Sequence, residues 1–173
     1  MLDDDLIEAA RRLIAICKRK NLLVATAESC TAGLVAGTLS EVPGASSILD
    51  RGYVTYSNEA KHDMLGVPRE VLVRHGAVSR ETAEAMVRGV LGRARVDLAV
   101  SVTGIAGPDG GSAEKPVGLV HFGAATRTGK LAHAEMRYGN IGRANVREKS
   151  VLQALLMLHE LAEGEGANPT PRT

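Results

Sequence analysis

Short runs of aliphatic residues alternate with longer amphipathic segments over most of the chain. Residues 22–27 and 97–103 are aliphatic runs of strand length, whereas residues 3–20 carry apolar side chains at helical spacing. Strands that alternate with helices are typical of a parallel sheet covered by helices on its faces. A chain of 173 residues is long enough for one domain with a buried core. The alternation therefore predicts an α/β domain.

Aromatic side chains are scarce, because the chain has one Phe, three Tyr and no Trp. The core must therefore be built from Val, Leu, Ile and Ala. Such a core suits helices packed on a buried parallel sheet, whose strands are short aliphatic runs. Composition and alternation thus predict the same architecture.

The remaining elements complete the predicted fold. Two neighbouring strands joined by a short turn, 118–125 and 131–138, predict an antiparallel pair. We expect a three-layer α/β/α sandwich with a mixed, mostly parallel sheet of about five strands. The other predicted elements are a strand at 52–57 and helices at 31–40, 58–65, 79–93 and 140–162. Residues 1–163 form the predicted single domain, and the polar, Pro- and Gly-containing residues 164–173 form a predicted disordered tail.

Charge and composition exclude several classes of partner. Lys and Arg total 21 against 20 Asp and Glu, so neither a basic excess nor an aromatic platform predicts binding to nucleic acid. The acidic N-terminal sequence and the lack of a long apolar run predict no membrane partner and a cytoplasmic location. Cys17, Cys30 and the five histidines have no metal-ligand spacing, so we expect no metal and no cofactor.

Three polar or glycine-rich segments follow predicted strands, at residues 28–33, 56–61 and 103–111. Ligands of open α/β sheets bind at this edge. In the first segment, Ser29 or Thr31 is either an ordinary helix N-cap or, for Ser29, a nucleophile that faces backbone N–H groups. In the second, Lys61 is either a solvated surface residue or a base that burial keeps neutral. The third is either a sharp surface turn or an anion-binding loop.

These segments together resemble a known family. TAESCTAG, GYVTYSNEAK, GAVS, SVTGIAGPDGG and EKPVG occur in the order and spacing of the CinA C-terminal domain family. The resemblance covers nearly the whole chain and implies the three-layer fold. It also implies hydrolysis of nicotinamide mononucleotide, a small-molecule nucleotide, to nicotinate mononucleotide and ammonia.

The resemblance also implies roles for individual residues. Ser29 matches the family's nucleophile and Lys61 its base, with Tyr56 beside them as a catalytic residue that could relay the proton. Arg143 matches an arginine on the phosphate side. Arg147 lies one helical turn later on the same face, and the alternative for both is a solvated surface arginine. Backbone N–H groups around Cys30 to Gly33, or that of Gly104, are expected to hold the oxyanion. The expected substrate-binding set is Cys30, Thr31, Gly33, Thr103, Gly104, Gly107 and Arg143.

Two other functions stay open at this point. One is a non-catalytic nucleotide-binding or regulatory domain linked to competence or DNA damage. The other is a broader nucleotide hydrolase, such as a phosphatase that uses the glycine loop. The sequence does not define the oligomeric state, so a homo-oligomer also stays open.

Overall fold

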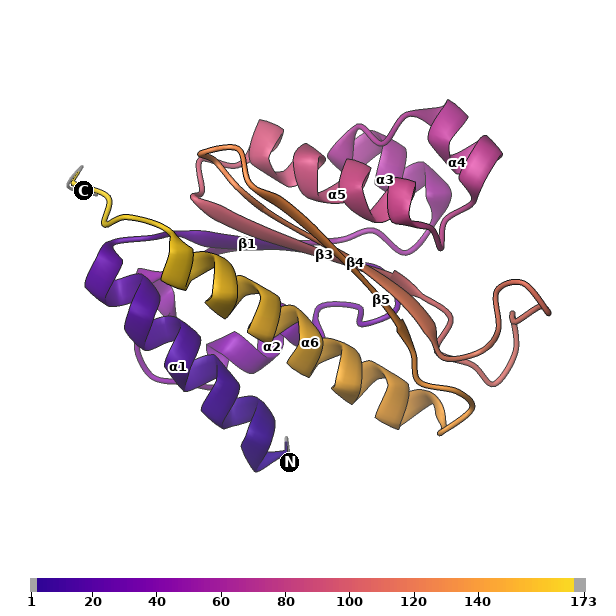
Figure 1. Ribbon diagram of the computed structural model, residues 1–173, viewed down its shortest axis with the longest axis horizontal. Helices are drawn as coiled ribbons and strands as arrows, with labels where there is room; N and C mark the ends of the chain where they lie inside the picture. Colours follow the sequence, from indigo (N-terminus) through magenta and orange to yellow (C-terminus); the bar gives the residue numbers. More distant parts are fainter. Residues whose placement is uncertain (1–2, 170–173) are drawn as a thin grey trace.

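The computed structural model describes residues 3–169, which form a five-stranded sheet with helices on both faces (Figure 1). No helix within this described range is both long enough and apolar enough to cross a membrane. In chain order the elements are α1 (Asp4–Lys20), β1 (Val24–Glu28), α2 (Leu34–Ser40), the 3₁₀ helix η1 (Ala45–Ser47), β2 (Leu49–Val54), α3 (Asn58–Leu65), α4 (Arg69–His75), α5 (Arg80–Arg93), β3 (Leu98–Gly104), β4 (Leu119–Thr126), β5 (Leu131–Arg137) and α6 (Arg143–Gly164).

The strand order across the sheet is β2-β1-β3-β4-β5. β1 pairs in parallel with both β2 and β3, while β4 is antiparallel to both β3 and β5. Only β4 therefore opposes the direction of the others. The predicted mixed sheet of five strands is confirmed, and the carboxyl ends of β1, β2 and β3 meet at one edge.

The two faces of the sheet are covered by different helices: α1, α2 and α6 on one side, and α3, α4 and α5 on the other (Figure 1). Alternate residues of β3 serve the two sides, because successive side chains of a strand point to opposite faces. Val100 belongs to the core beneath α1 and α6, and Ala99 to the core beneath α5. On the α5 side β3 carries the small residues Ala99 and Ser101, and the Ser101 hydroxyl donates to the Ala83 carbonyl at 2.6 Å. These small side chains allow α5 to pack close to β3.

α1 shows how local sequence sets an element's bounds. The Asp3 carboxylate accepts a hydrogen bond from the N–H of Asp5, and Asn21 ends the helix in the left-handed conformation with φ of 55°. Acidic residues stand in the first turn and Lys18, Arg19 and Lys20 in the last, an arrangement that complements the helix dipole.

Three predicted elements differ from the structure by three residues at one end or both: β2, α2 and α6, which was expected at 140–162 but covers Arg143–Gly164. β2 was expected at 52–57 but covers Leu49–Val54, because pairing with β1 fixes its register and Asp50 and Arg51 hide its start in the sequence. α2 was expected from residue 31 but begins at Leu34. The preceding residues form a turn in which Ala32 has φ of 51° and Gly33 φ of 94°, values that no α-helix contains.

The C-terminal end of α6 contacts α1. The Lys20 ammonium donates to the carbonyl oxygens of Ala162 and Glu165 at 2.8 and 2.6 Å. The backbone N–H of Asn168 donates to the Lys20 carbonyl at 2.8 Å. The predicted tail therefore overlaps the last helical residue and this contact, while residues 170–173 lie outside the described part.

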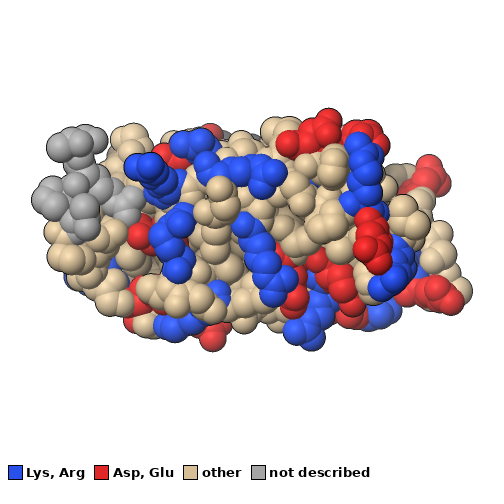
Figure 2. All heavy atoms as spheres, turned by 90° about the horizontal axis from the view of Figure 1, so that it is seen from above, with Lys and Arg blue, Asp and Glu red and all other residues tan. Residues whose placement is uncertain are grey.

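Basic and acidic side chains are interspersed on the face of the molecule seen from above (Figure 2). This face carries α3, α4 and α5. The mixture agrees with a net charge of +1, and it gives this face no single-sign field that would attract a polyanion.

Candidate active site

Ser29 and Lys61 meet at the carboxyl edge of the sheet. Ser29 directly follows β1, and its backbone N–H donates to the carbonyl of Val102 in β3 at 2.9 Å. Lys61 lies in the first turn of α3, which begins after Ser57, whose hydroxyl accepts from the N–H of Ala60. The Nζ atom of Lys61 lies 3.1 Å from the Oγ atom of Ser29. Lys61 therefore reaches from a helix on one face of the sheet to the turn that follows β1.

The Lys61 side chain is only 1% exposed. Besides Ser29, its Nζ atom contacts the main-chain carbonyl oxygens of Thr55 at 2.9 Å and Tyr56 at 3.4 Å. Within residues 3–169 no carboxylate forms an ion pair with it, and burial lowers its pKa below the ordinary value of 10.5. A neutral amine has two N–H donors and one lone pair, which matches two carbonyls and one serine hydroxyl. The geometry therefore suits a neutral lysine that accepts the Ser29 proton.

Ser29 opens a tight turn that ends at Gly33. The N–H of Ala32 donates to the Ser29 carbonyl at 3.0 Å, and Ala32 itself has φ of 51°. A non-glycine residue in the left-handed region costs about 1–3 kcal/mol and is concentrated at functional sites. The turn thus lifts Ser29 out of the strand, although only 8% of the residue is exposed.

The buried Glu28 carboxylate caps α2 from beneath this turn. It accepts hydrogen bonds from the N–H groups of Gly33, Val35 and Ala36 at 2.9–3.0 Å. These donors are therefore engaged by Glu28, and the expectation that the N–H of Gly33 faces an oxyanion is wrong. Of the turn's N–H groups, only those of Cys30 and Thr31 donate to no backbone or carboxylate oxygen in the described chain.

Cys30 is a rival nucleophile by position but not by ionisation. Its side chain is buried, and burial raises the pKa of its thiol to about 11. Because the thiolate is the reactive form of cysteine, the thiol is unreactive at neutral pH. Ser29 is therefore the better candidate of these two adjacent residues.

Two buried hydroxyls belong to residues near the Ser29–Lys61 pair: Thr31 follows Ser29 by two residues, and the Thr55 carbonyl contacts Lys61. The Oγ1 atoms of Thr31 and Thr55 have no hydrogen-bond partner in the described part of the chain. Unpaired buried polar groups are uncommon in folded proteins. Because neither residue is exposed, a substrate atom could reach these hydroxyls only after a local rearrangement.

Tyr56 and Arg143 form the exposed rim of the site. The Tyr56 side chain is 58% exposed, and its hydroxyl accepts from Nη2 of Arg143 at 2.8 Å. Nη1 of Arg143 donates to the Gly107 carbonyl at 3.1 Å. Lys61 contacts the main chain of Tyr56 and not its phenol. The structure therefore brings Arg143, Tyr56 and Gly107 together, but it does not put the phenol between Lys61 and Ser29.

Thr103 and Gly104 have structural reasons for their identities. The Thr103 hydroxyl donates to the Ala77 carbonyl at 2.7 Å, which ties β3 to the segment before α5. A Cβ atom at Gly104 would lie 2.9 Å from the Leu119 carbonyl oxygen, so only glycine fits against β4. Both residues lie at the same edge of the sheet as Ser29, where Thr103 contacts Ala77 and Gly104 packs against β4.

Arg147 and Glu28 are the residues that sequence analysis did not place in the site with a role. Arg147 reaches from α6 to the carbonyl oxygens of Cys30 and Thr31 at 3.1 and 3.2 Å. The available signal was its position four residues after Arg143, on the same helix face. For Glu28 the only signal in the sequence was its position next to Ser29, because its capping contacts depend on the shape of the turn.

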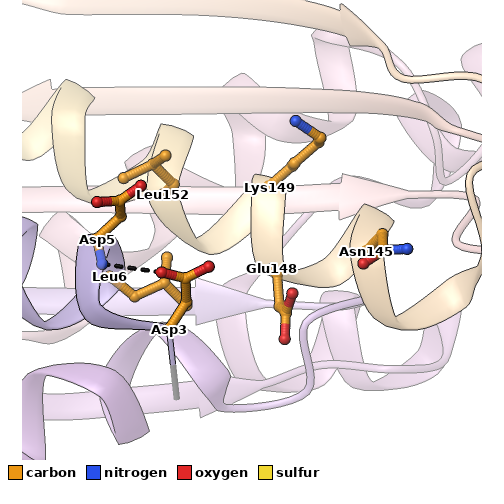
Figure 3. Close-up of a pocket in the computed structure, with 7 residues that line it drawn as sticks. All are labelled: Asp3, Asp5, Leu6, Asn145, Glu148, Lys149 and Leu152. Carbon is orange, nitrogen blue, oxygen red and sulfur yellow. Dashed lines mark hydrogen bonds between the residues drawn. The ribbon is translucent and has the colours of Figure 1, made fainter.

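A separate pocket lies between the start of α1 and α6 (Figure 3). Three carboxylates face it, but one of them, Asp3, is the N-cap of α1. Within residues 3–169 no group of three or more His, Cys, Asp or Glu side chains is placed to hold a metal ion. The pocket shares no residue with the Ser29 site, and it is lined by Asp3, Asp5, Leu6, Asn145, Glu148, Lys149 and Leu152.

Comparison with known proteins finds relatives over most of the chain. The family model "CinA C-terminal domain" matches residues 7–162. A putative competence-damage inducible protein of Caldicellulosiruptor bescii is 46% identical over 92% of this chain, which spans only 38% of that protein's length. The nicotinamide-nucleotide amidohydrolase PncC of Enterobacter agglomerans is 44% identical over 92% of this chain and 98% of its own.

A solved structure is similar over the whole described fold. The crystal structure of competence/damage inducible protein CihA from Agrobacterium tumefaciens has a TM-score of 0.92 and 55% sequence identity. The match covers 93% of this chain and 98% of that one.

Proposed function

Because this chain belongs to the CinA C-terminal domain family, we propose that it hydrolyses the carboxamide of nicotinamide mononucleotide to nicotinate mononucleotide and ammonia. The observation that carries the proposal is the 3.1 Å contact between a buried lysine amine and the Ser29 hydroxyl. The name of the Enterobacter agglomerans relative, whose length the chain covers almost completely, supports the choice of substrate.

The proposed reaction starts with attack of Ser29 Oγ on the carboxamide carbon. The neutral Lys61 amine takes the hydroxyl proton while the carbonyl oxygen becomes an oxyanion. The N–H groups of Cys30 and Thr31, which are not engaged by protein oxygens, are placed in the same turn to stabilise that charge. Lys61 needs no relay through the Tyr56 phenol, because it contacts Ser29 directly.

Collapse of the tetrahedral intermediate breaks the C–N bond. Lys61 returns its proton to the leaving nitrogen, which departs as ammonia and leaves an ester on Ser29. A water molecule then attacks the ester, Lys61 accepts one of its protons, and Ser29 recovers that proton as the carboxylic acid is released. The positive pyridinium ring withdraws electrons from the carboxamide, which favours both attacks.

Arg143 is the proposed partner of the substrate's 5′-phosphate. It is exposed beside Tyr56 and Gly107, and no carboxylate of residues 3–169 pairs with it. An arginine fork matches phosphate oxygens in pairs. Thr103 and the glycines of the 104–111 loop form the remaining wall of the proposed site, on a domain that we assign to residues 1–163.

The test is ammonia release from nicotinamide mononucleotide by the purified chain. We expect stoichiometric nicotinate mononucleotide, no inorganic phosphate, and an unchanged rate in a metal chelator. Phosphate release would instead select the phosphatase alternative, and binding without turnover would select a non-catalytic regulatory domain. The same preparation, measured by light scattering, would establish whether the chain is a homo-oligomer. A cytoplasmic location remains a prediction of the sequence.

A further inference from the structure

Arg147 connects the last helix to the turn that carries Ser29. Its Nε atom donates to the Cys30 carbonyl at 3.1 Å, and its Nη2 atom donates to the Thr31 carbonyl at 3.2 Å. The side chain is half-buried, and no carboxylate in residues 3–169 lies within ion-pair distance of it. The partners of the guanidinium are main-chain carbonyls, so no acidic side chain of the described residues offsets its positive charge beside the turn.

The planarity of the peptide bond gives this contact a direction. In a trans peptide the C=O and N–H bonds lie in one rigid plane and point in opposite directions. The Cys30 carbonyl and the Thr31 N–H belong to the same peptide, so a donor that fixes the carbonyl also aims the N–H. Arg147 therefore holds the Thr31 N–H on the side away from α6.

The neighbouring peptide is fixed in the same manner by a different donor. The N–H of Ala32 holds the Ser29 carbonyl at 3.0 Å, and that carbonyl shares a peptide with the Cys30 N–H. Glu28 meanwhile engages the N–H groups of Gly33, Val35 and Ala36. The carbonyl groups of Ser29, Cys30 and Thr31 are thus all held by donors, while the N–H groups of Cys30 and Thr31 donate to no oxygen in the described part of the chain.

We propose that Arg147 is a positioning residue that aims the Thr31 N–H at the oxyanion formed at Ser29. This inference rests on the proposed role of Ser29 as nucleophile. The positive charge also polarises the Cys30–Thr31 peptide, because hydrogen bonds in a chain strengthen one another. Its effect belongs to the transition state, where the oxyanion exists, and not to substrate binding.

The core provides a reason why removal of Arg147 should leave the fold intact. α6 is held by buried side chains that include Val146, Val151 and Leu155, all of which pack in the core beneath α1 and α6. Arg147 lies outside this cluster. A change at Arg147 should therefore alter the turn more than the docking of the helix.

The experiment compares Arg147→Ala, Arg147→Lys and the control Lys149→Ala in nicotinamide mononucleotide hydrolysis. Lys149 is an exposed cation on the same helix that faces the pocket of Figure 3. For Arg147→Ala we expect kcat to fall about 30-fold or more with KM within about threefold, because misaligned oxyanion donors act on the transition state. Arg147→Lys should lose less, and Lys149→Ala should match the wild type.

Chemical rescue separates positioning from a general structural role. Guanidinium ion, added at a concentration that leaves the wild-type rate unchanged, should restore part of the kcat of Arg147→Ala. It should not restore Ser29→Ala. An unchanged kcat in Arg147→Ala would overturn the inference. So would a loss that guanidinium does not restore and that is accompanied by a large fall in the melting temperature.

A fluorophosphonate probe distinguishes this inference from the choice of substrate. Ser29 Oγ would form a bond to phosphorus, fluoride would leave, and Lys61 would take the hydroxyl proton. If the wild type is labelled at Ser29 but does not hydrolyse nicotinamide mononucleotide, the proposed substrate is wrong. Slower labelling of Arg147→Ala would then still support the positioning role, and equal labelling would overturn it. If Ser29 is never labelled and no hydrolysis occurs, the positioning role fails with the nucleophile.

Discussion

The Nζ atom of Lys61, in helix α3, lies 3.1 Å from the Oγ atom of Ser29, which directly follows strand β1. Burial lowers the pKa of Lys61, and the polar partners of its Nζ atom are two main-chain carbonyls and the serine. A Ser-His-Asp site prepares its base through a hydrogen-bonded carboxylate. Here burial of Lys61 away from water favours its neutral form, which is the form that can accept the Ser29 proton.

Replacement of Ser29 by alanine should abolish turnover. We expect kcat to fall by about a thousandfold or more, because loss of a true nucleophile removes the covalent step. Calorimetry should show substrate affinity close to that of the wild type. Ser40→Ala, at an exposed hydroxyl on α2, is the matched control and should retain full activity. If Ser29→Ala keeps about a tenth of the wild-type kcat, another group is the nucleophile.

The pH profile should report on Lys61. Its neutral form is the active one, so kcat/KM should rise with pH and level off above an apparent pKa that lies below 10.5, because burial lowers the pKa. Lys61→Arg should lower kcat/KM about a hundredfold or more at every pH, since a guanidinium does not deprotonate. A flat wild-type profile between about pH 6 and 9 would argue against a lysine base whose pKa falls in that range.

The same lowered pKa affects stability. Between the folded-state pKa of Lys61 and the unfolded value near 10.5, the unfolded chain binds the extra proton. The free energy of unfolding should therefore rise with pH across this window. Lys61→Met removes the titration, so the difference between wild type and Lys61→Met in denaturant unfolding should shift in favour of the wild type as pH rises. A pH-independent difference would mean that burial does not perturb this lysine.

Tyr56→Phe tests the proton relay. The phenol accepts from Arg143 and does not contact Lys61, which touches only the main chain of Tyr56. We expect a loss of about threefold to tenfold in kcat/KM, the size of one ordinary hydrogen bond, because water competes for this exposed contact. The pH profile should keep its shape. A loss in kcat comparable to that of Lys61→Arg would restore the relay.

Arg143→Ala tests phosphate recognition. Because Arg143 is exposed, we expect the lower end of the range for a broken charge pair, about 2 kcal/mol in kcat/KM for nicotinamide mononucleotide. The weaker reaction with nicotinamide riboside, which has no phosphate, should barely change. Arg88→Ala on α5 provides a control for the loss of an exposed arginine elsewhere. Equal losses with both substrates would assign Arg143 a structural role.

Sequence patterns predicted the elements better than the contacts at the site. The helix expected at 58–65 has those bounds in the structure, because Ser57 and Gly66 are strong caps. β2 was displaced by three residues, since an edge strand takes its register from a partner that is distant in the sequence. The family resemblance is confirmed. The roles that it implied for Ser29 and Lys61 stay predictions, and the structure puts these two side chains in contact.

Contacts that depend on the shape of one turn could not be predicted in this way. No periodicity indicates that Glu28 caps α2 across Gly33, or that Arg147 reaches two carbonyls more than a hundred residues earlier in the chain. Both follow from the left-handed conformation of Ala32, which the sequence does not reveal because alanine seldom adopts it. Only the position of Arg147 one turn after Arg143 pointed to the site.

The reach of Arg147 to the Ser29 turn has a consequence for the order of events during synthesis. A nascent chain presents its serine and lysine early, while the arginine that holds the turn emerges only with the last helix. A ribosome-bound chain that stops before α6 should therefore carry the nucleophile and the base in a turn that is not yet held. Full catalytic activity should therefore appear only after α6 has docked against the sheet.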